Sequence, residues 1–321
     1  SCDDADAGYY VPTTGQSTQT ACLAGTYNPS TGSTSSSACA DADAGYYVST
    51  TAQSSQTACA VGTYQVDTGE ASCDDADAGY YVSTTAQTSQ NACATGTYQS
   101  LTGQSSCDDA DAGSYVPTTG QTSQTACAVG TYQENTAQNS CVGASAGYYV
   151  STTGQSGQTV CSTGTYQATT GQTSCDDADA GYFVLTTAQS SQTACLTGTY
   201  QALTGQSFCD DADAGYFVLT TAQSSQTACS VGTYQVLTGQ SSCDDAAAGY
   251  YVSSTAQSNQ NACLAGTYQA TTSQTSCDDA TAGHYVSSPA QSSQTACLAG
   301  TYNPNIVSTS SSACADADLG Y

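Results

Sequence analysis

The chain of 321 residues contains 26 acidic side chains and no lysine or arginine, which gives a formal net charge of −26. Without cationic side chains it has nothing to neutralise phosphate groups, so the composition argues strongly against nucleic-acid binding. Only 31 residues are Leu, Ile, Val or Phe, too few for an ordinary globular core, and no apolar run approaches the roughly 20 residues of a membrane-spanning helix.

Nineteen cysteines impose a regular repeat on this polar sequence. A longer spacing, as from Cys73 to Cys93, alternates with a shorter one, as from Cys93 to Cys107, and together they make a 34-residue period. Two of the shorter spacings, which begin at Cys22 and Cys297, are three residues longer than the rest. Regular cysteines along a whole chain predict disulfides and therefore an oxidising, extracellular location.

Zinc binding is the weaker interpretation of these cysteines. Close Cys-x-x-Cys pairs are absent from the sequence, and His284 is the only histidine. A zinc site in each unit would need ligands in each unit, and a single histidine cannot supply them.

The period predicts one tandem-repeat array over residues 1–321. The array comprises a partial unit at 1–21, full units at 22–58, 59–92, 93–126, 127–160, 161–194, 195–228, 229–262 and 263–296, and a partial unit at 297–321. Residues 22–46 and 297–321 match at 21 of 25 positions, so that Cys297 repeats Cys22. This second periodicity predicts a super-repeat, and we expect the sequence to be a fragment of a longer chain.

Each unit contains two similar arms, and we define them on the unit at 59–92. The short arm runs from Cys59 to Cys73, and the long arm runs from Cys73 to Cys93. Both arms place a Gly-x-Tyr after the opening cysteine and a Thr-rich turn later. Period-2 alternation around Tyr and Val, without an apolar stripe of period 3.6, predicts short β-hairpins. The expected fold is all-β, small and disulfide-rich: an elongated rod of hairpins with no large hydrophobic core.

Copies of the long arm indicate which positions are constrained. The residue after the glycine varies and includes Ser114 and His284, whereas the following residue is always aromatic and the next is always valine. We therefore expect the second aromatic to be packed against a neighbouring unit and the first to face solvent. Two glutamines also recur, as in Gln53 and Gln56. They fit either a ladder of side-chain amides or solvated turns.

The short-arm pattern Cys-x-x-Gly-Thr-Tyr-x-x-x-Thr-Gly-x-x-x-Cys resembles the ephrin-receptor-like cysteine-rich repeats, which are related to TNF-receptor and EGF-like modules. The resemblance implies that the cysteines pair consecutively, beginning at Cys22 and leaving Cys2 without a partner in this sequence. In that family the long arm would also carry a pair, at the positions of Ala76 and Gln90. Both cysteines are missing together, which favours bridges across the short arms. The implied pairs are Cys22–Cys39, Cys59–Cys73, Cys93–Cys107, Cys127–Cys141, Cys161–Cys175, Cys195–Cys209, Cys229–Cys243, Cys263–Cys277 and Cys297–Cys314.

Most acidic residues form short clusters after the cysteine that opens each long arm. Oxygen-rich clusters suit Ca²⁺, so calcium binding is one hypothesis, and a solvated face that keeps a fibre soluble is the favoured alternative. The spacing is not that of an EF-hand loop, and the arm after Cys141 has no acids. The calcium candidates are Asp74, Asp75, Asp77, Asp108, Asp109, Asp111, Asp176, Asp177, Asp179, Asp210, Asp211 and Asp213.

Hydroxyl residues are concentrated in the turns, for example at Thr50, Thr51, Thr84 and Thr85. Because the only Asn-x-Ser/Thr sequence, at Asn28, contains proline at its middle position, attached sugars are expected to be O-linked.

The sequence predicts a structural protein and no enzymatic activity. His284 occupies the variable aromatic position of a repeat, so it is interpreted as a substituted tyrosine. The leading hypothesis is an extracellular structural protein, the backbone or subunit of a filament, stalk or mastigoneme-like appendage. Its expected partners are itself, as a homopolymer or continuous fibre, and other appendage proteins. The alternative is a ligand-binding cell-surface ectodomain or adhesin stalk, stiffened by Ca²⁺.

Overall fold

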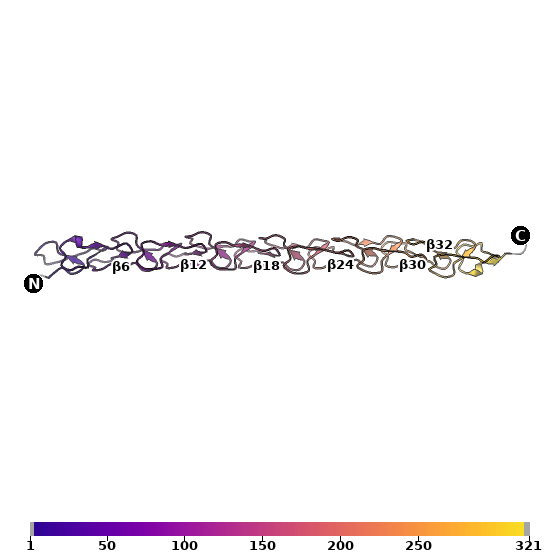
Figure 1. Cartoon of the computed structure of the whole chain (residues 1–321), viewed down its shortest axis with the longest axis horizontal. Helices are drawn as coiled ribbons and strands as arrows, with labels where there is room; N and C mark the ends of the chain where they lie inside the picture. The colour runs from indigo at the N-terminus through magenta and orange to yellow at the C-terminus, as the bar shows by residue number, and fades with distance from the viewer. Residues whose placement is uncertain (1–2, 318–321) are drawn as a thin grey trace. The chain divides into compact units, whose positions relative to one another are not determined.

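The computed structural model describes residues 3–317 and consists almost wholly of two-residue strands, each paired with the next strand along the chain (Figure 1). The strands are β1 (Tyr9–Tyr10), β2 (Thr20–Ala21), β3 (Thr26–Tyr27), β4 (Ala40–Asp41), β5 (Tyr46–Tyr47), β6 (Thr57–Ala58), β7 (Thr63–Tyr64), β8 (Asp74–Asp75), β9 (Tyr80–Tyr81), β10 (Asn91–Ala92), β11 (Thr97–Tyr98), β12 (Asp108–Asp109), β13 (Ser114–Tyr115), β14 (Thr125–Ala126), β15 (Thr131–Tyr132), β16 (Val142–Gly143), β17 (Tyr148–Tyr149), β18 (Thr159–Val160), β19 (Thr165–Tyr166), β20 (Asp176–Asp177), β21 (Tyr182–Phe183), β22 (Thr193–Ala194), β23 (Thr199–Tyr200), β24 (Asp210–Asp211), β25 (Tyr216–Phe217), β26 (Thr227–Ala228), β27 (Thr233–Tyr234), β28 (Asp244–Asp245), β29 (Tyr250–Tyr251), β30 (Asn261–Ala262), β31 (Thr267–Tyr268), β32 (Asp278–Asp279), β33 (His284–Tyr285), β34 (Thr295–Ala296), β35 (Thr301–Tyr302) and β36 (Ala315–Asp316). Two short 3₁₀ helices, η1 (Ser36–Ala38) and η2 (Ser311–Ala313), lie in the two short arms that are three residues longer than the others.

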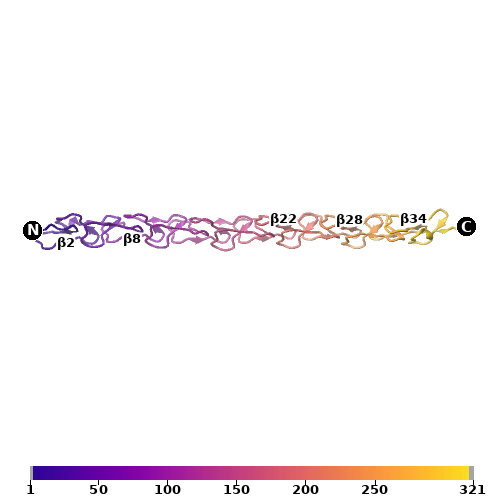
Figure 2. The same ribbon diagram turned by 90° about the horizontal axis from the view of Figure 1, so that it is seen from below.

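The chain divides into two compact units. Unit 1 comprises residues 1–145, 149–159 and 170–174, and unit 2 comprises 146–148, 160–169 and 175–321. Within each unit the hairpins follow one another in chain order, as Figures 1 and 2 both show. The predicted all-β, disulfide-rich fold with a 34-residue period is confirmed.

Every hairpin has the same register whether it belongs to a short or a long arm. In a short arm, Tyr64 of β7 lies opposite Asp74 of β8, and in the following long arm Tyr81 of β9 lies opposite Asn91 of β10. A ladder of two residue pairs is marginal on its own in water. Each hairpin must therefore be stabilised by other contacts, which come from the neighbouring arms and from cross-links inside the arm.

Backbone hydrogen bonds join each arm to the next. In unit 1 the Gly62 N–H donates to Val82 O at 2.8 Å and the Gln65 N–H donates to Gln87 O at 3.1 Å. In the opposite direction, the Ala86 N–H donates to Cys59 O at 2.9 Å. The same three bonds recur between successive arms within both units, so the repeated contact is made mainly by the backbone.

The core consists of small side chains rather than aromatic ones. Cys59, Ala76 and Val82 are each fully buried, and their equivalents recur along both units. Both aromatics of the long arm, such as Tyr80 and Tyr81, are half-buried, so the expected division into one packed and one solvent-facing ring is wrong. The backbones of neighbouring arms approach so closely that only small side chains fit between them.

Candidate functional site

Nine disulfides bridge the short arms. The structure joins the nine consecutive pairs that the family resemblance implies, from Cys22–Cys39 to Cys297–Cys314, with Cα–Cα distances of 5.6–5.8 Å. In the arm at 59–73 the first cysteine is fully buried and the second is half-buried. The prediction that Cys2 lacks a partner falls outside the described residues.

A buried amide, which the sequence analysis missed, fixes the inside of each short arm. The Gln99 side chain is only 4% exposed; its Nε2 donates to Ser106 O at 3.0 Å, and its Oε1 accepts from the Leu101 N–H at 3.0 Å. The signal was available, because Gln follows Gly-Thr-Tyr in seven short arms and Asn follows it in the other two. A polar residue at a fixed position next to a β-hairpin indicates a satisfied buried group.

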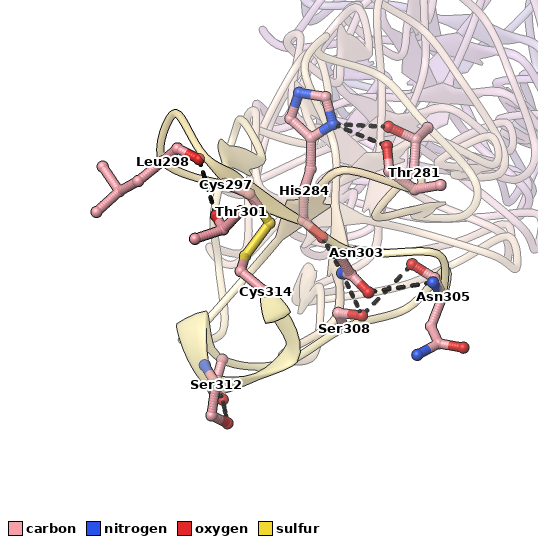
Figure 3. The surroundings of a disulfide bond; sticks show 12 residues. Thr281, His284, Cys297, Leu298, Thr301, Asn303, Asn305, Ser308, Ser312 and Cys314 are labelled. Carbon is pink, nitrogen blue, oxygen red and sulfur yellow. Dashed lines mark hydrogen bonds between the residues drawn. A yellow bond between two sulfur atoms is a disulfide. The ribbon is translucent and has the colours of Figure 1, made fainter. Parts of the chain in front are cut away.

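The two extended short arms use asparagine for the same purpose. The Asn303 Nδ2 donates to His284 O at 2.9 Å and to Ser308 Oγ at 2.8 Å, while the Asn305 N–H donates to Asn303 Oδ1. Figure 3 shows this amide between His284 and Ser308, beside the Cys297–Cys314 disulfide. The shorter side chain therefore binds the previous arm as well as its own loop.

Long arms are closed by a hydrogen-bonded clasp between an aspartate and a glutamine. In the arm at 73–93, the Asp77 N–H donates to Gln90 Oε1 and the Gln90 Nε2 donates to Asp77 Oδ2, both at 2.6 Å. The clasp recurs with an aspartate at position 6, 43, 111, 179 and 213. The second recurrent glutamine is therefore neither part of a ladder between units nor a free solvated residue.

The first recurrent glutamine stays within its own turn. The Gln53 Nε2 donates to Thr50 Oγ1 at 3.0 Å and to Thr51 O at 3.4 Å. Both sets of glutamines therefore bond inside one arm, and the ladder hypothesis is not supported.

The clasp stands where the short arm has its disulfide. Alignment of a short arm with the long arm that follows it places Cys59 on Ala76, Gly62 on Gly79 and Cys73 on Gln90. Ala76 is as fully buried as Cys59, and Gln90 bonds to the residue that follows Ala76. The structural repeat is therefore a single hairpin, half as long as the sequence period, and it is closed alternately by a covalent and a noncovalent cross-link.

Three long arms carry natural variants of the clasp. Ser145 and Thr281 replace the aspartate with a hydroxyl side chain, and Ala247 removes the side-chain partner altogether. In all three arms the backbone N–H still donates to the glutamine Oε1, at 2.6–2.7 Å. The half that uses the backbone is therefore the constant part of the clasp.

Removal of a clasp is expected to open its arm locally. In the arm at 107–127, Gln124→Ala deletes both bonds to Asp111, whereas Asp111→Ala deletes only the bond that Ala247 naturally lacks. At about 1 kcal/mol per hydrogen bond, the amide of residue 111 should exchange roughly fivefold faster in Gln124→Ala than in Asp111→Ala. Hydrogen exchange followed by mass spectrometry measures this, with the exposed Asp109→Ala as control. Equal exchange rates in all three variants would show that the clasp contributes no stability.

The acidic clusters lie on the second strand of the short-arm hairpins. Asp74 and Asp75 form β8 and are exposed, while Asp77 belongs to the clasp. The other predicted calcium ligands at 108–111, 176–179 and 210–213 occupy equivalent places. Over residues 3–317, no three His, Cys, Asp or Glu side chains are grouped so that they could hold a metal ion. The Asp74 and Asp75 side chains therefore belong to an exposed acidic face.

Short-arm tyrosines lie beside these acids. Burial raises the pKa of the Tyr64 phenol, and the carboxylates of Asp77 and Asp74 raise it further. Tyr166 and Tyr200 have the same surroundings and the same direction of pKa shift. These rings therefore stay protonated and neutral at physiological pH.

The predicted glycan acceptors are accessible. Thr50, Thr51, Thr84 and Thr85 are all exposed on the turns of long arms. The Thr50 hydroxyl accepts a hydrogen bond from Gln53, whereas the turn around Thr85 is held through its backbone oxygen by Gln87. Exposed hydroxyls on well-ordered turns can carry a substituent without loss of packing.

His284 lies on β33, opposite Ala296, at the variable position of the long arm. Its Nδ1 is 3.1 Å from Thr281 Oγ1, as Figure 3 shows. This threonine hydroxyl is its only described side-chain partner, and the Nδ1 also lies 3.4 Å from Ala282 O.

No family model matches the sequence, and no curated protein is significantly similar to it.

Proposed function

We propose that this protein is an extracellular structural protein, the backbone or a subunit of a filament, stalk or similar surface appendage. The observation that carries the proposal is that each arm repeats the same contacts to the next arm and the same internal cross-link. A protein whose units contact mainly their neighbours gains length by adding units and needs no central core.

The disulfides support the extracellular location. Nine bridges in one chain would not persist in a reducing cytosol. Among residues 3–317, no helix has both the length and the apolar character needed to cross a membrane. In the absence of cationic side chains every charged group is negative, and this repulsion favours hydration and opposes unspecific lateral association.

The repeated threonine turns support O-linked glycosylation of this structural protein. They are exposed, they recur in the long arms other than the one at 277–297, and turns such as those at Thr51 and Thr85 have their backbone already held by glutamine. Proteolytic peptides of the native protein that contain these turns should exceed their sequence masses by whole sugar units, and the excess should disappear on chemical deglycosylation. Agreement with the sequence mass would contradict glycosylation and leave the structural role standing.

Imaging tests the structural role. Native material, isolated without reducing agent and examined by electron microscopy, should contain uniform filaments or stalks that incorporate this chain. Localisation by a specific antibody should place the chain along the filament shaft. A chain found only at a tip, or only as a dispersed receptor fragment, would contradict the proposal.

A ligand-binding ectodomain is the second candidate, and one observation favours it. Several leucines of unit 2, including Leu185, Leu203 and Leu219, are more than 60% exposed. Exposed apolar side chains of this size often mark interaction surfaces. A ligand captured by the isolated chain under non-reducing conditions would support this candidate over the structural one.

A further inference from the structure

Phenylalanine occurs in only one part of the repeat array. The three phenylalanines of the sequence are Phe183, Phe208 and Phe217, all in unit 2. Phe183 and Phe217 stand where the other long arms have tyrosine, so each differs from the repeat by one hydroxyl. Phe208 stands directly before the closing cysteine of its short arm, where the other eight short arms have serine or alanine. Phe208 is therefore a departure from the repeat that no other short arm shares.

The fold uses the backbone of Phe208 in the same way as it uses a serine. The Gln201 Nε2 donates to Phe208 O at 3.0 Å, just as the Gln99 Nε2 donates to Ser106 O at 3.0 Å. The Phe208 side chain is 59% exposed, although a phenyl ring in water is unfavourable. Because the buried bond is the same with either residue, the ring is available for a contact outside the arm.

The position of Phe208 lies at the edge of a surface hollow. In the arm at 263–277, where the hollow is seen with a serine at this position, its volume is about 260 Å³. The hollow lies between the short arm and the second aromatic of the preceding long arm. It is lined by Tyr251, Leu264, Thr267, Ser276 and Cys277.

The arm at 195–209 meets its preceding long arm through the same backbone contact. The Cys195 N–H donates to Gly181 O at 2.9 Å, and the Cys263 N–H donates to Gly249 O at 2.9 Å. Both short arms have the same hairpin register and the same disulfide. The equivalent hollow is therefore lined by Phe183, Leu196, Thr199, Phe208 and Cys209.

This second hollow has a more apolar lining than the first. Phe183 replaces a tyrosine and Phe208 replaces a serine, while Leu196 keeps the leucine of the arm at 263–277. Leu196 is 69% exposed and Phe208 is 59% exposed, so both side chains are accessible. No other short arm in the sequence combines a leucine after its first cysteine with an aromatic residue before its second. Exposed apolar side chains that converge in this way mark interaction surfaces.

The surroundings of the apolar hollow are acidic. Asp210 and Asp211 follow Cys209 directly, form β24 and are exposed. A partner that fills the hollow must therefore bring an apolar side chain together with cationic groups that face these carboxylates. A second copy of this sequence has no lysine or arginine, so it would bring carboxylates against carboxylates.

We infer that the hollow lined by Phe183, Leu196 and Phe208 binds a segment of another protein that carries an aromatic or aliphatic side chain flanked by lysine or arginine. The apolar side chain supplies most of the affinity, and the flanking cations select the partner. The inference goes beyond the proposed structural role and does not depend on it. It gives the array one site that is distinguished from the repeated arms.

Two substitutions on the full oxidised chain form a matched pair. Phe208→Ser removes the ring and restores the residue that most short arms carry. Leu203→Thr removes another exposed apolar side chain of the same arm and introduces the residue found at 169 and 271. The Leu203 N–H donates to Gln201 Oε1, as the Thr271 N–H does to Gln269 Oε1, so this bond is kept. Thr271 is not among the residues that line the hollow at 263–277, so Leu203→Thr is the control.

Three fluorescently labelled peptides are the probes, and fluorescence anisotropy in about 150 mM NaCl measures their binding. The peptide Lys-Lys-Phe-Leu-Lys-Lys should bind the parent chain and Leu203→Thr equally, and it should bind Phe208→Ser roughly tenfold more weakly. Lys-Lys-Ser-Ser-Lys-Lys should bind all three chains weakly and equally, because it retains only the attraction of opposite charges. Glu-Glu-Phe-Leu-Glu-Glu should not bind.

Several results would overturn the inference. Equal binding of the first peptide to the parent chain and to Phe208→Ser, or no binding to either, would show that the hollow does not recognise such a segment. Binding of the acidic peptide would remove the role of the cations. Self-association of the parent chain that is lost in Phe208→Ser, measured by sedimentation velocity, would assign the hollow to a second copy instead. None of these results bears on whether the chain lies along native filaments, so the proposed function is tested separately.

Discussion

Reduction of the nine disulfides is expected to unfold both units of the chain in otherwise native buffer. Each bridge across a 14-residue separation closes a loop of about 15 residues and contributes about 3 kcal/mol in the chain-entropy model. Because each hairpin has only two paired residues on each strand and its core side chains are small, no other term replaces a contribution of that size. Far-UV circular dichroism and hydrogen exchange, before and after treatment with a phosphine reductant, measure the loss.

Removal of a single bridge should destabilise its own arm locally, because that arm loses the same loop-closure contribution. The double substitution Cys93→Ala/Cys107→Ala removes one bridge without leaving a free thiol. Amides of that arm and of the adjoining arms should then exchange at least tenfold faster, while distant arms of the same unit stay protected, because stability in a repeat array is a sum of local terms. Retained protection in the fully reduced chain would contradict the view that the bridges stabilise the fold.

Much of the fold follows from the sequence alone. The alternation of Gly-x-Tyr with Thr-rich turns predicts the hairpins, whereas the register in which Tyr64 faces Asp74 is known only from the structure. The sequence repeats every 34 residues because hairpins closed by a disulfide alternate with hairpins closed by an Asp–Gln clasp. The family that the short arm resembles carries a further cysteine pair at the positions of Ala76 and Gln90, and its paired absence here favours bridges across the short arms, which the structure contains.

The identity of the core could not be predicted by the same reasoning. Periodic aromatics normally indicate the packed face, yet here the fully buried positions are Ala76, Val82 and Cys93. This core depends on how closely successive backbones approach, which is set by hydrogen bonds between residues of different arms, such as Gly79 N–H to Gln99 O. The pattern of side chains within one arm does not reveal how closely the backbones of successive arms approach.

The Asp–Gln clasp was hidden for a related reason. Asp77 belongs to a conspicuous acidic cluster, so its charge suggests a cation, whereas its actual partner is Gln90 thirteen residues later. Asp74 and Asp75 in the same cluster remain exposed on β8. Charge composition therefore identifies the acidic face, and only the hairpin register separates the aspartate of the clasp from its neighbours.

The substitution Gly79→Ala is expected to disrupt its arm, whereas Gly120→Ala should be tolerated, although the two glycines face each other in one contact. Both have positive φ, at 87° and 72°, which costs an alanine about 1–2 kcal/mol relative to glycine at either site. The difference lies in what the added methyl group meets. On Gly79 it would lie 2.3 Å from Gly120 O, closer than any real contact, and the Gly79 N–H would lose its bond to Gln99 O. On Gly120 its nearest neighbour is the Tyr80 hydroxyl at 3.7 Å.

Internal copies of the repeat already contain the tolerated substitution. The turn position of Gly120 is occupied by Ala52 and Ala86 in other long arms, whereas the position of Gly79 is glycine in every arm. Overpacking of this kind adds about 1–3 kcal/mol to the backbone strain. Limited proteolysis and hydrogen exchange of the oxidised chain should therefore show local opening around residue 79 in Gly79→Ala and near-native protection in Gly120→Ala, with Gly157→Ala as an unstrained control. Equal protection in the two variants would mean that neighbouring arms can separate to admit a methyl group, so that close backbone contact is not what restricts the core to small side chains.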